Sequence, residues 1–367
     1  MFKGATMWRL GILLAFILAL AVGFYTGSTT AQSKLVTEEE INNVVIRNRA
    51  IKSVVMVIAK SAPEAVPQGE DPNFFSSGFF YKPNLIVTNY HAINNSPVSI
   101  RVQLFDGRQF PVTIEAYDPG IDIAVLRVSG VTAPAVVKFG NSGDVMPGQK
   151  AIILGAPLKK PNNISVGVVS SFNRIEEFND DIGVEIPEML LTDANIESGN
   201  SGGPILDSKG NLIGVVDANL ESTITATGKV GLGIPSNLVQ QSLNDLERFG
   251  RSQRGQLGAT LKDVSELEPF ALEAVGLSSS RGALVLDVEP DGAGAKSGLQ
   301  ASEISSDGKL KRLGDIILKV DSKTVQGRFD TIQEIAKRRP GQVLTLTVWR
   351  NKKPVQLKVT VTPRLPR

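Results

Sequence analysis

The chain has 367 residues, more than one ordinary domain holds, which predicts two or three domains that each bury a hydrophobic core. Its 39 basic and 37 acidic residues nearly cancel, so it lacks the strong positive charge of a nucleic-acid-binding protein. The absence of cysteine excludes disulfides, thiol catalysis and thiolate metal sites, and a single histidine argues against structural zinc. We therefore expect no metal, no cofactor and no nucleic-acid partner.

Residues 1–33 predict export from the cytoplasm. Lys3 and Arg9 precede an apolar run from Leu10 to Tyr25, and small polar residues follow it, as in a secretory signal. The run is a little shorter than the ~20 residues that span a bilayer, but counting from Met7 makes an uncleaved membrane anchor just as feasible. Because positive charge stays inside the cell, we expect the remainder in the periplasm or on the extracytoplasmic face of the membrane.

Residues 34–49 predict a linker with a short helix, because Thr37 and the glutamates after it are typical of a helix start. From residue 50 to 250, short Val- and Ile-rich runs alternate with Gly, Pro, Asn and Asp, which predicts a sandwich or barrel of many short strands. A helix is expected at 236–249, with Ser236 as its cap and Gly250 at its end.

One serine, Ser201, lies among glycines in the stretch Asp193-Ala-Asn-Ile-Glu-Ser-Gly-Asn-Ser-Gly-Gly-Pro204. A serine is a poor nucleophile unless a base takes its proton and donors stabilise the charge that develops on the substrate. Glycines allow the backbone N–H groups of Gly199 and Ser201 to converge on one point, as an oxyanion hole requires. A surface turn has the same composition, so the motif alone decides little.

Two further residues complete a possible catalytic set. His91 follows the apolar run that begins at Leu85, and Asp122 precedes another apolar run. A packed histidine and a turn aspartate are the ordinary interpretations of each residue alone. Together with Ser201, however, they follow the chain order His, Asp, Ser of the double β-barrel proteases.

The sequence motifs around these residues resemble the signatures of the HtrA/Deg family of trypsin-like serine proteases. The resemblance is carried by Thr88-Asn-Tyr-His91, Asp122-Ile-Ala-Val-Leu126 and Thr192-Asp-Ala-Asn-Ile-Glu-Ser-Gly-Asn-Ser-Gly-Gly203. It implies a mainly β fold, with a double six-stranded, chymotrypsin-like β-barrel at 50–250. It also implies that Ser201 attacks the scissile carbonyl, His91 accepts its proton and Asp122 orients the imidazole.

The resemblance further places Ile196 and Leu220 at the walls of the specificity pocket. Neither residue is charged, so the pocket would favour small or medium aliphatic side chains before the cleaved bond. An ordinary role in the hydrophobic core is the alternative for both residues.

Residues 255–367 resemble the α+β PDZ domain that is attached to these proteases. In it, Gly255, Gln256, Leu257 and Gly258 fit the loop whose backbone N–H groups bind a peptide C-terminus. A final hairpin is expected from Val343 to Thr362. The insertion at 300–309 departs from the family pattern, and a homotrimer is expected from the resemblance alone.

These features predict an envelope serine endopeptidase that degrades or processes unfolded or damaged proteins, with the PDZ domain binding peptide C-termini. One alternative is a membrane-anchored regulatory protease with one signalling substrate. The other is a catalytically weak chaperone or peptide-binding protein, although a pure binder has no chemical need for all of His91, Asp122 and Ser201.

Overall fold

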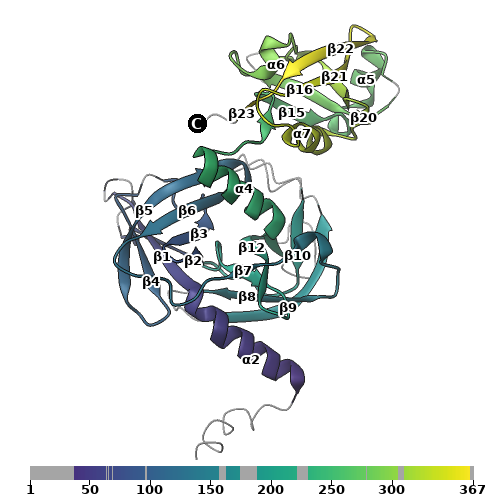
Figure 1. The fold of residues 1–367 in the computed structure, drawn as a ribbon. Helices are drawn as coiled ribbons and strands as arrows, with labels where there is room; N and C mark the ends of the chain where they lie inside the picture. Colours follow the sequence, from purple (N-terminus) through teal and green to yellow (C-terminus); the bar gives the residue numbers. More distant parts are fainter. Residues whose placement is uncertain are drawn as a thin grey trace, which may run out of the picture.

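The structure is a computed structural model, and it describes residues 37–363 except 63, 65, 68, 96, 157–162, 174–187, 221–229, 278 and 305–309. The predicted signal or anchor at 1–33 lies outside the described residues. Helix α2 (Glu38–Ala50) opens the described chain at the bottom of Figure 1. It begins with a capping box: the Thr37 side chain accepts from the Glu40 N–H, and the Glu40 side chain accepts from the Thr37 N–H.

Six antiparallel strands close the first barrel in the order β1-β2-β3-β6-β5-β4, and β4 pairs back with β1. Alternate residues point into the barrel, so Val57, Phe80 and Leu126 are buried in its interior. The strands are β1 (Val54–Lys60), β2 (Asn73–Lys82), β3 (Leu85–Asn89), β4 (Ser99–Leu104), β5 (Gln109–Asp118) and β6 (Ile123–Val128).

The second barrel closes in the order β11-β8-β9-β10-β13-β12, because β12 pairs back with β11. A short strand, β7 (Lys138–Phe139), runs parallel to the start of β12. The predicted mainly β, double-barrel fold is thus confirmed. The six barrel strands are β8 (Lys150–Gly155), β9 (Asn163–Asn173), β10 (Met189–Thr192), β11 (Pro204–Leu206), β12 (Asn211–Leu220) and β13 (Val230–Pro235).

Helix α4 (Ser236–Phe249) follows the second barrel and packs Val239, Leu243 and Leu246 against the core between the barrels. It ends at Gly250 in the left-handed conformation, as predicted. The predicted cap at Ser236 is wrong, because this residue is already the first of the helix and its hydroxyl donates to the carbonyl of Gly140.

The C-terminal domain is a five-stranded sheet in the order β15-β16-β19-β21-β22, with β20 paired to β19. The predicted final hairpin is present, and Asn351 and Lys352 form its turn with positive φ angles of 50° and 62°. The elements are β14 (Gly255–Gln256), β15 (Ala259–Asp263), α5 (Pro269–Ala274), β16 (Ala283–Val288), α6 (Ala293–Lys296), β17 (Glu303–Ile304), β18 (Leu310–Arg312), β19 (Ile316–Val320), β20 (Lys323–Thr324), α7 (Arg328–Ala336), β21 (Val343–Arg350), β22 (Lys353–Thr360) and β23 (Thr362–Pro363).

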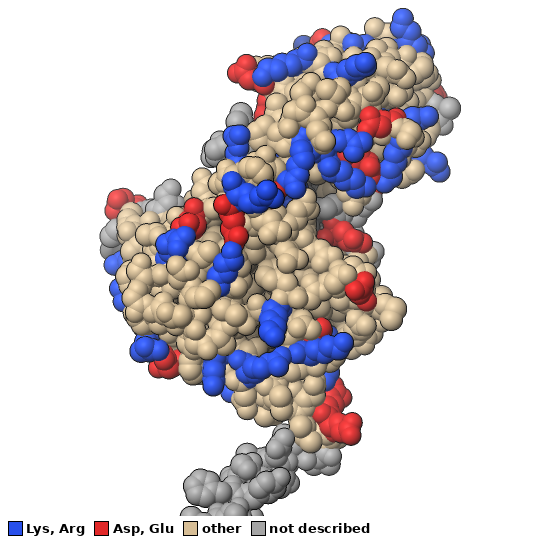
Figure 2. Space-filling view, in the orientation of Figure 1, with Lys and Arg blue, Asp and Glu red and all other residues tan. Residues whose placement is uncertain are grey.

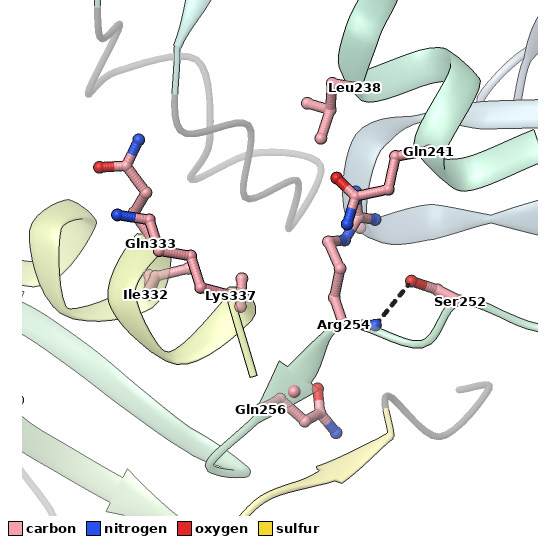
Figure 3. Close-up of a pocket in the computed structure, with 11 residues that line it drawn as sticks. Leu238, Gln241, Ser252, Arg254, Gln256, Ile332, Gln333 and Lys337 are labelled. Carbon is pink, nitrogen blue, oxygen red and sulfur yellow. Dashed lines mark hydrogen bonds between the residues drawn. The ribbon is translucent and has the colours of Figure 1, made fainter. Parts of the chain in front are cut away.

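The two domains meet where α4 lies beneath the C-terminal domain (Figure 1). Arg254, in the connection, donates to the buried carboxylate of Asp118 at 2.5 Å, and Arg339 pairs with Asp245 of α4 at 2.6 Å. A pocket opens beside Arg254 between α4, the connection and α7, and Gln241 and Gln333 line it on opposite sides (Figure 3). On the face shown in Figure 2, basic and acidic side chains are interspersed, in keeping with the near-neutral composition.

Candidate active site

His91 and Asp122 are in direct contact between the ends of β3 and β6. Asp122 takes the left-handed conformation, with φ 55°, at the end of the short 3-10 helix Pro119–Ile121 and just before β6. Its carboxylate accepts twice from His91, from the backbone N–H at 2.7 Å and from the ring Nδ1 at 2.6 Å. With the proton on Nδ1, the other ring nitrogen, Nε2, keeps the lone pair that a general base needs.

The loop that carries Ser201 is tied to the first barrel through one residue of β2. The hydroxyl of Ser77 donates to the carbonyl of Gly199 at 2.6 Å, and its backbone N–H donates to the carbonyl of Ser201 at 2.8 Å. Gly202 has φ 83°, and a Cβ there would lie 2.2 Å from the Ser77 carbonyl oxygen. Only glycine therefore fits at this crossing of the two barrels.

The hydroxyl of Ser201 points to strand β12 and not to the imidazole. Its Oγ donates to the backbone carbonyl of Asp217 at 2.8 Å. Among the described residues, no hydrogen bond joins Ser201 to His91. The predicted bridge from His91 to both partners is thus seen on the Asp122 side, and the Ser201 side would require a rotation of the serine side chain.

Two backbone donors near Ser201 have no partner in the described chain. The N–H groups of Gly199 and Ser201 make no hydrogen bond to another described residue, whereas those of Asn200, Gly202 and Gly203 do. Gly199 has φ 96°, a conformation that favours glycine. Both donors named for the oxyanion hole are thus uncommitted, which is what binding to a developing oxyanion requires.

Asp217 is a member of this site that the sequence reasoning missed. It follows Val215 and Val216 on β12, and its Oδ1 lies 4.0 Å from the Nδ1 of His91. Burial and the neighbouring Asp122 carboxylate raise the pKa of Asp217 well above its usual value. An acidic residue directly after the apolar run 212–216, inside a strand, was the signal that could have revealed it.

His91 and the two acids form one candidate metal cluster in the part of the chain that the structure describes. One ligand atom from each of His91, Asp122 and Asp217 lies within 4.8 Å of the other two. However, the Nδ1 of His91 contacts the Oδ2 of Asp122 directly at 2.6 Å, which leaves no room for an ion between them. The site is better described as a hydrogen-bonded His–Asp pair with a second acid beside it.

The two residues named for the specificity pocket have different outcomes. Ile196 is 2% exposed and belongs to the core of the second barrel, where its Cδ1 lies 2.5 Å from the place that a Cβ on Gly231 would take. This position favours the alternative of a core residue. Leu220 ends β12, paired with Val230, and its side chain lies outside what the structure describes.

The predicted peptide-binding loop begins as a short strand. Gly255 and Gln256 form β14, which pairs with β23, and the N–H of Gly255 donates to the carbonyl of Arg338 at 2.8 Å. The N–H groups of Leu257 and Gly258 donate to no other described residue. The second half of the predicted loop therefore has backbone donors without a partner among the described residues, and it leads into β15, an edge strand of the domain's sheet.

Comparison with known proteins agrees with this architecture. Residues 76–215 match the trypsin-like peptidase domain, and residues 255–361 match the PDZ domain. The chain is 33% identical over 326 residues to the chloroplastic Protease Do-like 1 of Arabidopsis thaliana, covering 88% of this chain and 69% of that protein. It is 32% identical over 302 residues to a probable periplasmic serine endoprotease, DegP-like, of Rickettsia conorii. That match covers 82% of this chain but only 54% of the rickettsial protein, so the chain spans about half of its length.

A solved structure shows the same arrangement of domains. The HtrA-type protease AlgW, determined with a decapeptide, superposes with a TM-score of 0.69 at 26% identity. The match covers 89% of this chain and 99% of that chain, so both domains take part in it. On the sequence, the fold and these relatives together, the chain belongs to the HtrA family of trypsin-like serine proteases with a PDZ domain.

Proposed function

We propose that the chain is an extracytoplasmic serine endopeptidase that cleaves unfolded or damaged proteins through an acyl-enzyme on Ser201. His91 serves as the general base and Asp122 holds its imidazole, with Gly199 and Ser201 donating to the oxyanion. One observation carries this proposal: Asp217 accepts from the Ser201 hydroxyl with its carbonyl while its carboxyl lies 4.0 Å from His91. His91, Asp122 and Ser201, which are far apart in the sequence, thus lie close to one residue of β12, Asp217.

The test uses the full-length protein in detergent, an unfolded protein substrate and a fluorophosphonate probe. Ser201→Ala should abolish both cleavage and labelling, because only an activated serine attacks the probe. The matched control is Ser208→Ala, which removes an exposed hydroxyl seven positions along the chain. Equal cleavage by the wild type and Ser201→Ala would refute the assignment of the nucleophile.

A regulated protease is the second candidate, and the position of the Ser201 hydroxyl favours it. Because that hydroxyl donates to Asp217 and not to His91, the described conformation needs a rearrangement before proton transfer. We propose that a peptide C-terminus bound at Leu257 and Gly258 favours this rearrangement. Peptides with a free C-terminus should then raise the rate of cleavage, and the same peptides with an amidated C-terminus should not.

The peptide site has its own variant. A Cβ on Gly258 would lie 2.9 Å from the Glu289 carboxylate, and its φ of 65° is strained for other residues. Gly258→Ala should therefore weaken peptide binding, measured by fluorescence anisotropy. Gly298→Ala provides a control, because no described atom lies within 4 Å of a Cβ at that position and its φ is also positive. Equal binding by the two variants would place the peptide elsewhere.

Location and assembly follow from the same proposal. The DegP-like relatives are named periplasmic, and we propose that residues 1–33 direct this chain out of the cytoplasm or anchor it in the membrane. Within the described part of the chain, no helix combines the length and hydrophobicity needed to cross a bilayer. We also propose a homotrimer, which sedimentation analysis of the purified protein would test.

A further inference from the structure

The carboxyl group of Asp217, if ionised, would have no hydrogen-bond donor among the described residues. The residue is 1% exposed, and neither of its side-chain oxygens meets a hydrogen-bond donor among the described residues. An ionised carboxylate can only accept hydrogen bonds, so this burial would leave its charge uncompensated. A protonated carboxyl has an O–H to donate, and therefore needs an acceptor close by.

Asp122 is that acceptor. Its carboxylate already receives the backbone N–H and the ring Nδ1 of His91, and its oxygens retain lone pairs for a further donor. An oxygen of each acid lies within 4.8 Å of the other and of the imidazole. Both carboxyls are buried, so two negative charges at this separation would repel strongly.

No cation offsets such a pair of charges. Within the described residues, neither Asp122 nor Asp217 forms an ion pair with a lysine or arginine. The titratable groups around them are His91, from the turn after β3, and Tyr90, whose pKa is raised by burial, by Tyr117 and by Asp122. Neither supplies a permanent positive charge. One proton shared between the acids is the arrangement that satisfies both.

We infer that Asp217 is a neutral carboxylic acid that donates a hydrogen bond to Asp122 and thereby positions the Asp122 carboxylate for His91. The inference rests on the proposed role of His91, Asp122 and Ser201. Asp217 is a positioning residue, because it acts on the imidazole through Asp122. Its backbone carbonyl holds the Ser201 hydroxyl in the described conformation, so one residue of β12 contacts both ends of the catalytic set.

The first test detects the protonated carboxyl group of Asp217 directly and needs no substrate. Infrared difference spectra of the full-length protein against Asp217→Asn should contain the C=O band of a protonated carboxylic acid, and the band should shift in deuterated water. Asp315→Asn is the matched control: Asp315 is also fully buried, but it is paired with Arg350 at 2.6 Å, and its replacement should not remove such a band. Absence of the band from the Asp217 spectrum overturns the inference.

The second test reads the imidazole. Because His91 is the only histidine, its signals in a protein labelled with ¹⁵N-histidine need no further assignment. The Nδ1 proton should remain sharp in the wild type and in Asp217→Asn, whose amide can still donate to Asp122. In Asp217→Ala this proton should exchange with water and broaden. Identical Nδ1 signals in all three proteins overturn the positioning role.

The third test separates positioning from binding. Asp217→Ala should lower kcat about tenfold or more with little change in KM, since a buried acceptor loses its donor next to the base. Asp217→Asn should recover a large part of that loss. Equal kcat for the two variants contradicts the inference. If the wild type cleaves nothing, the proposed function fails, while the infrared and NMR tests still decide the state of Asp217.

Discussion

At the scale of single residues, the buried acid on β12 should make stability depend on pH. Its raised pKa means that the folded chain holds the Asp217 proton more tightly than the unfolded chain does. The associated stabilisation is fully present below the ordinary pKa of 3.8 and is lost as the pH rises toward the raised value of the folded state. Asparagine at this position carries no such dependence.

We therefore expect the melting temperature of the wild type to fall relative to that of Asp217→Asn as the pH is raised from about 4. Calorimetry of both proteins across the pH range measures this difference. Asp287→Asn, at an exposed position of β16, is the control and should track the wild type. A constant difference between wild type and Asp217→Asn at every pH would contradict the expectation.

The residue scale also shows what the sequence could and could not predict. His91, Asp122 and Ser201 are recognisable because each lies in a distinctive local sequence motif. The structure brings His91 and Asp122 into contact. No such motif marks Asp217. Its role depends on the path of β12 past His91, and the local sequence does not determine that path. Ser236 was misjudged as a cap because its hydroxyl is taken by Gly140, nearly a hundred positions earlier in the chain.

At the scale of elements, β2 holds the loop that carries Ser201 through contacts of Ser77. Its hydroxyl accepts from the N–H of Ala156 at 2.9 Å and donates to the carbonyl of Gly199, so it joins both barrels to the loop. The neighbouring Ser76 is also buried, but its hydroxyl has no hydrogen-bond partner among the residues that the structure describes. The two serines form a natural pair for comparison.

We expect Ser77→Ala to cost about 1–3 kcal/mol in the free energy of unfolding and to lower kcat, because it leaves two buried backbone groups unpaired. Ser76→Ala should be nearly neutral or slightly stabilising, since it removes an unsatisfied hydroxyl. Denaturant unfolding and peptide cleavage by both variants measure these effects. Equal destabilisation by the two substitutions would show that the Ser77 contacts do not anchor the loop.

The same scale explains which elements were predictable. The β21–β22 hairpin follows from alternating apolar residues around Asn351 and Lys352, which tolerate the turn. Helix α7 begins at Arg328, where the Gly327 carbonyl accepts from both the hydroxyl and the backbone N–H of Thr331. The closure of each barrel pairs strands distant in the chain, and here the family resemblance supplied what periodicity could not.

At the scale of the whole molecule, one arginine links the PDZ domain to the loop of the proposed triad. Arg254 precedes β14 and pairs with Asp118, whose other contacts are the Ser242 hydroxyl and the N–H of Gly120. Asp118 lies four residues before Asp122. The pair is almost fully enclosed, with side-chain exposures of 15% and 1%.

We expect Arg254→Met to destabilise the protein by about 2 kcal/mol, because it leaves the buried Asp118 carboxylate without its cation. Arg339→Met should cost less than Arg254→Met, because the Arg339 guanidinium is 51% exposed against 15% for Arg254, although the Asp245 carboxylate is itself buried. Calorimetry measures both. If the Arg339 variant is the less stable one, the turn after α7 and not the connection provides the main tie between the domains.

Helix α2 orients the chain before it relative to the second barrel. Its side chains are fixed to the β11–β12 turn, where Asn42 donates to the carbonyl of Ser208 and Arg49 to that of Lys209. With 13 residues at about 1.5 Å each, it is roughly 20 Å long, and it lies against the second barrel along much of that length, because Asn43 also accepts from Lys150 of β8. Whatever the chain before Thr37 is attached to, the orientation of the second barrel relative to that attachment is set by this helix. Inserting whole helical turns before Glu38 would lengthen the connection without altering the contacts of Asn42 and Arg49.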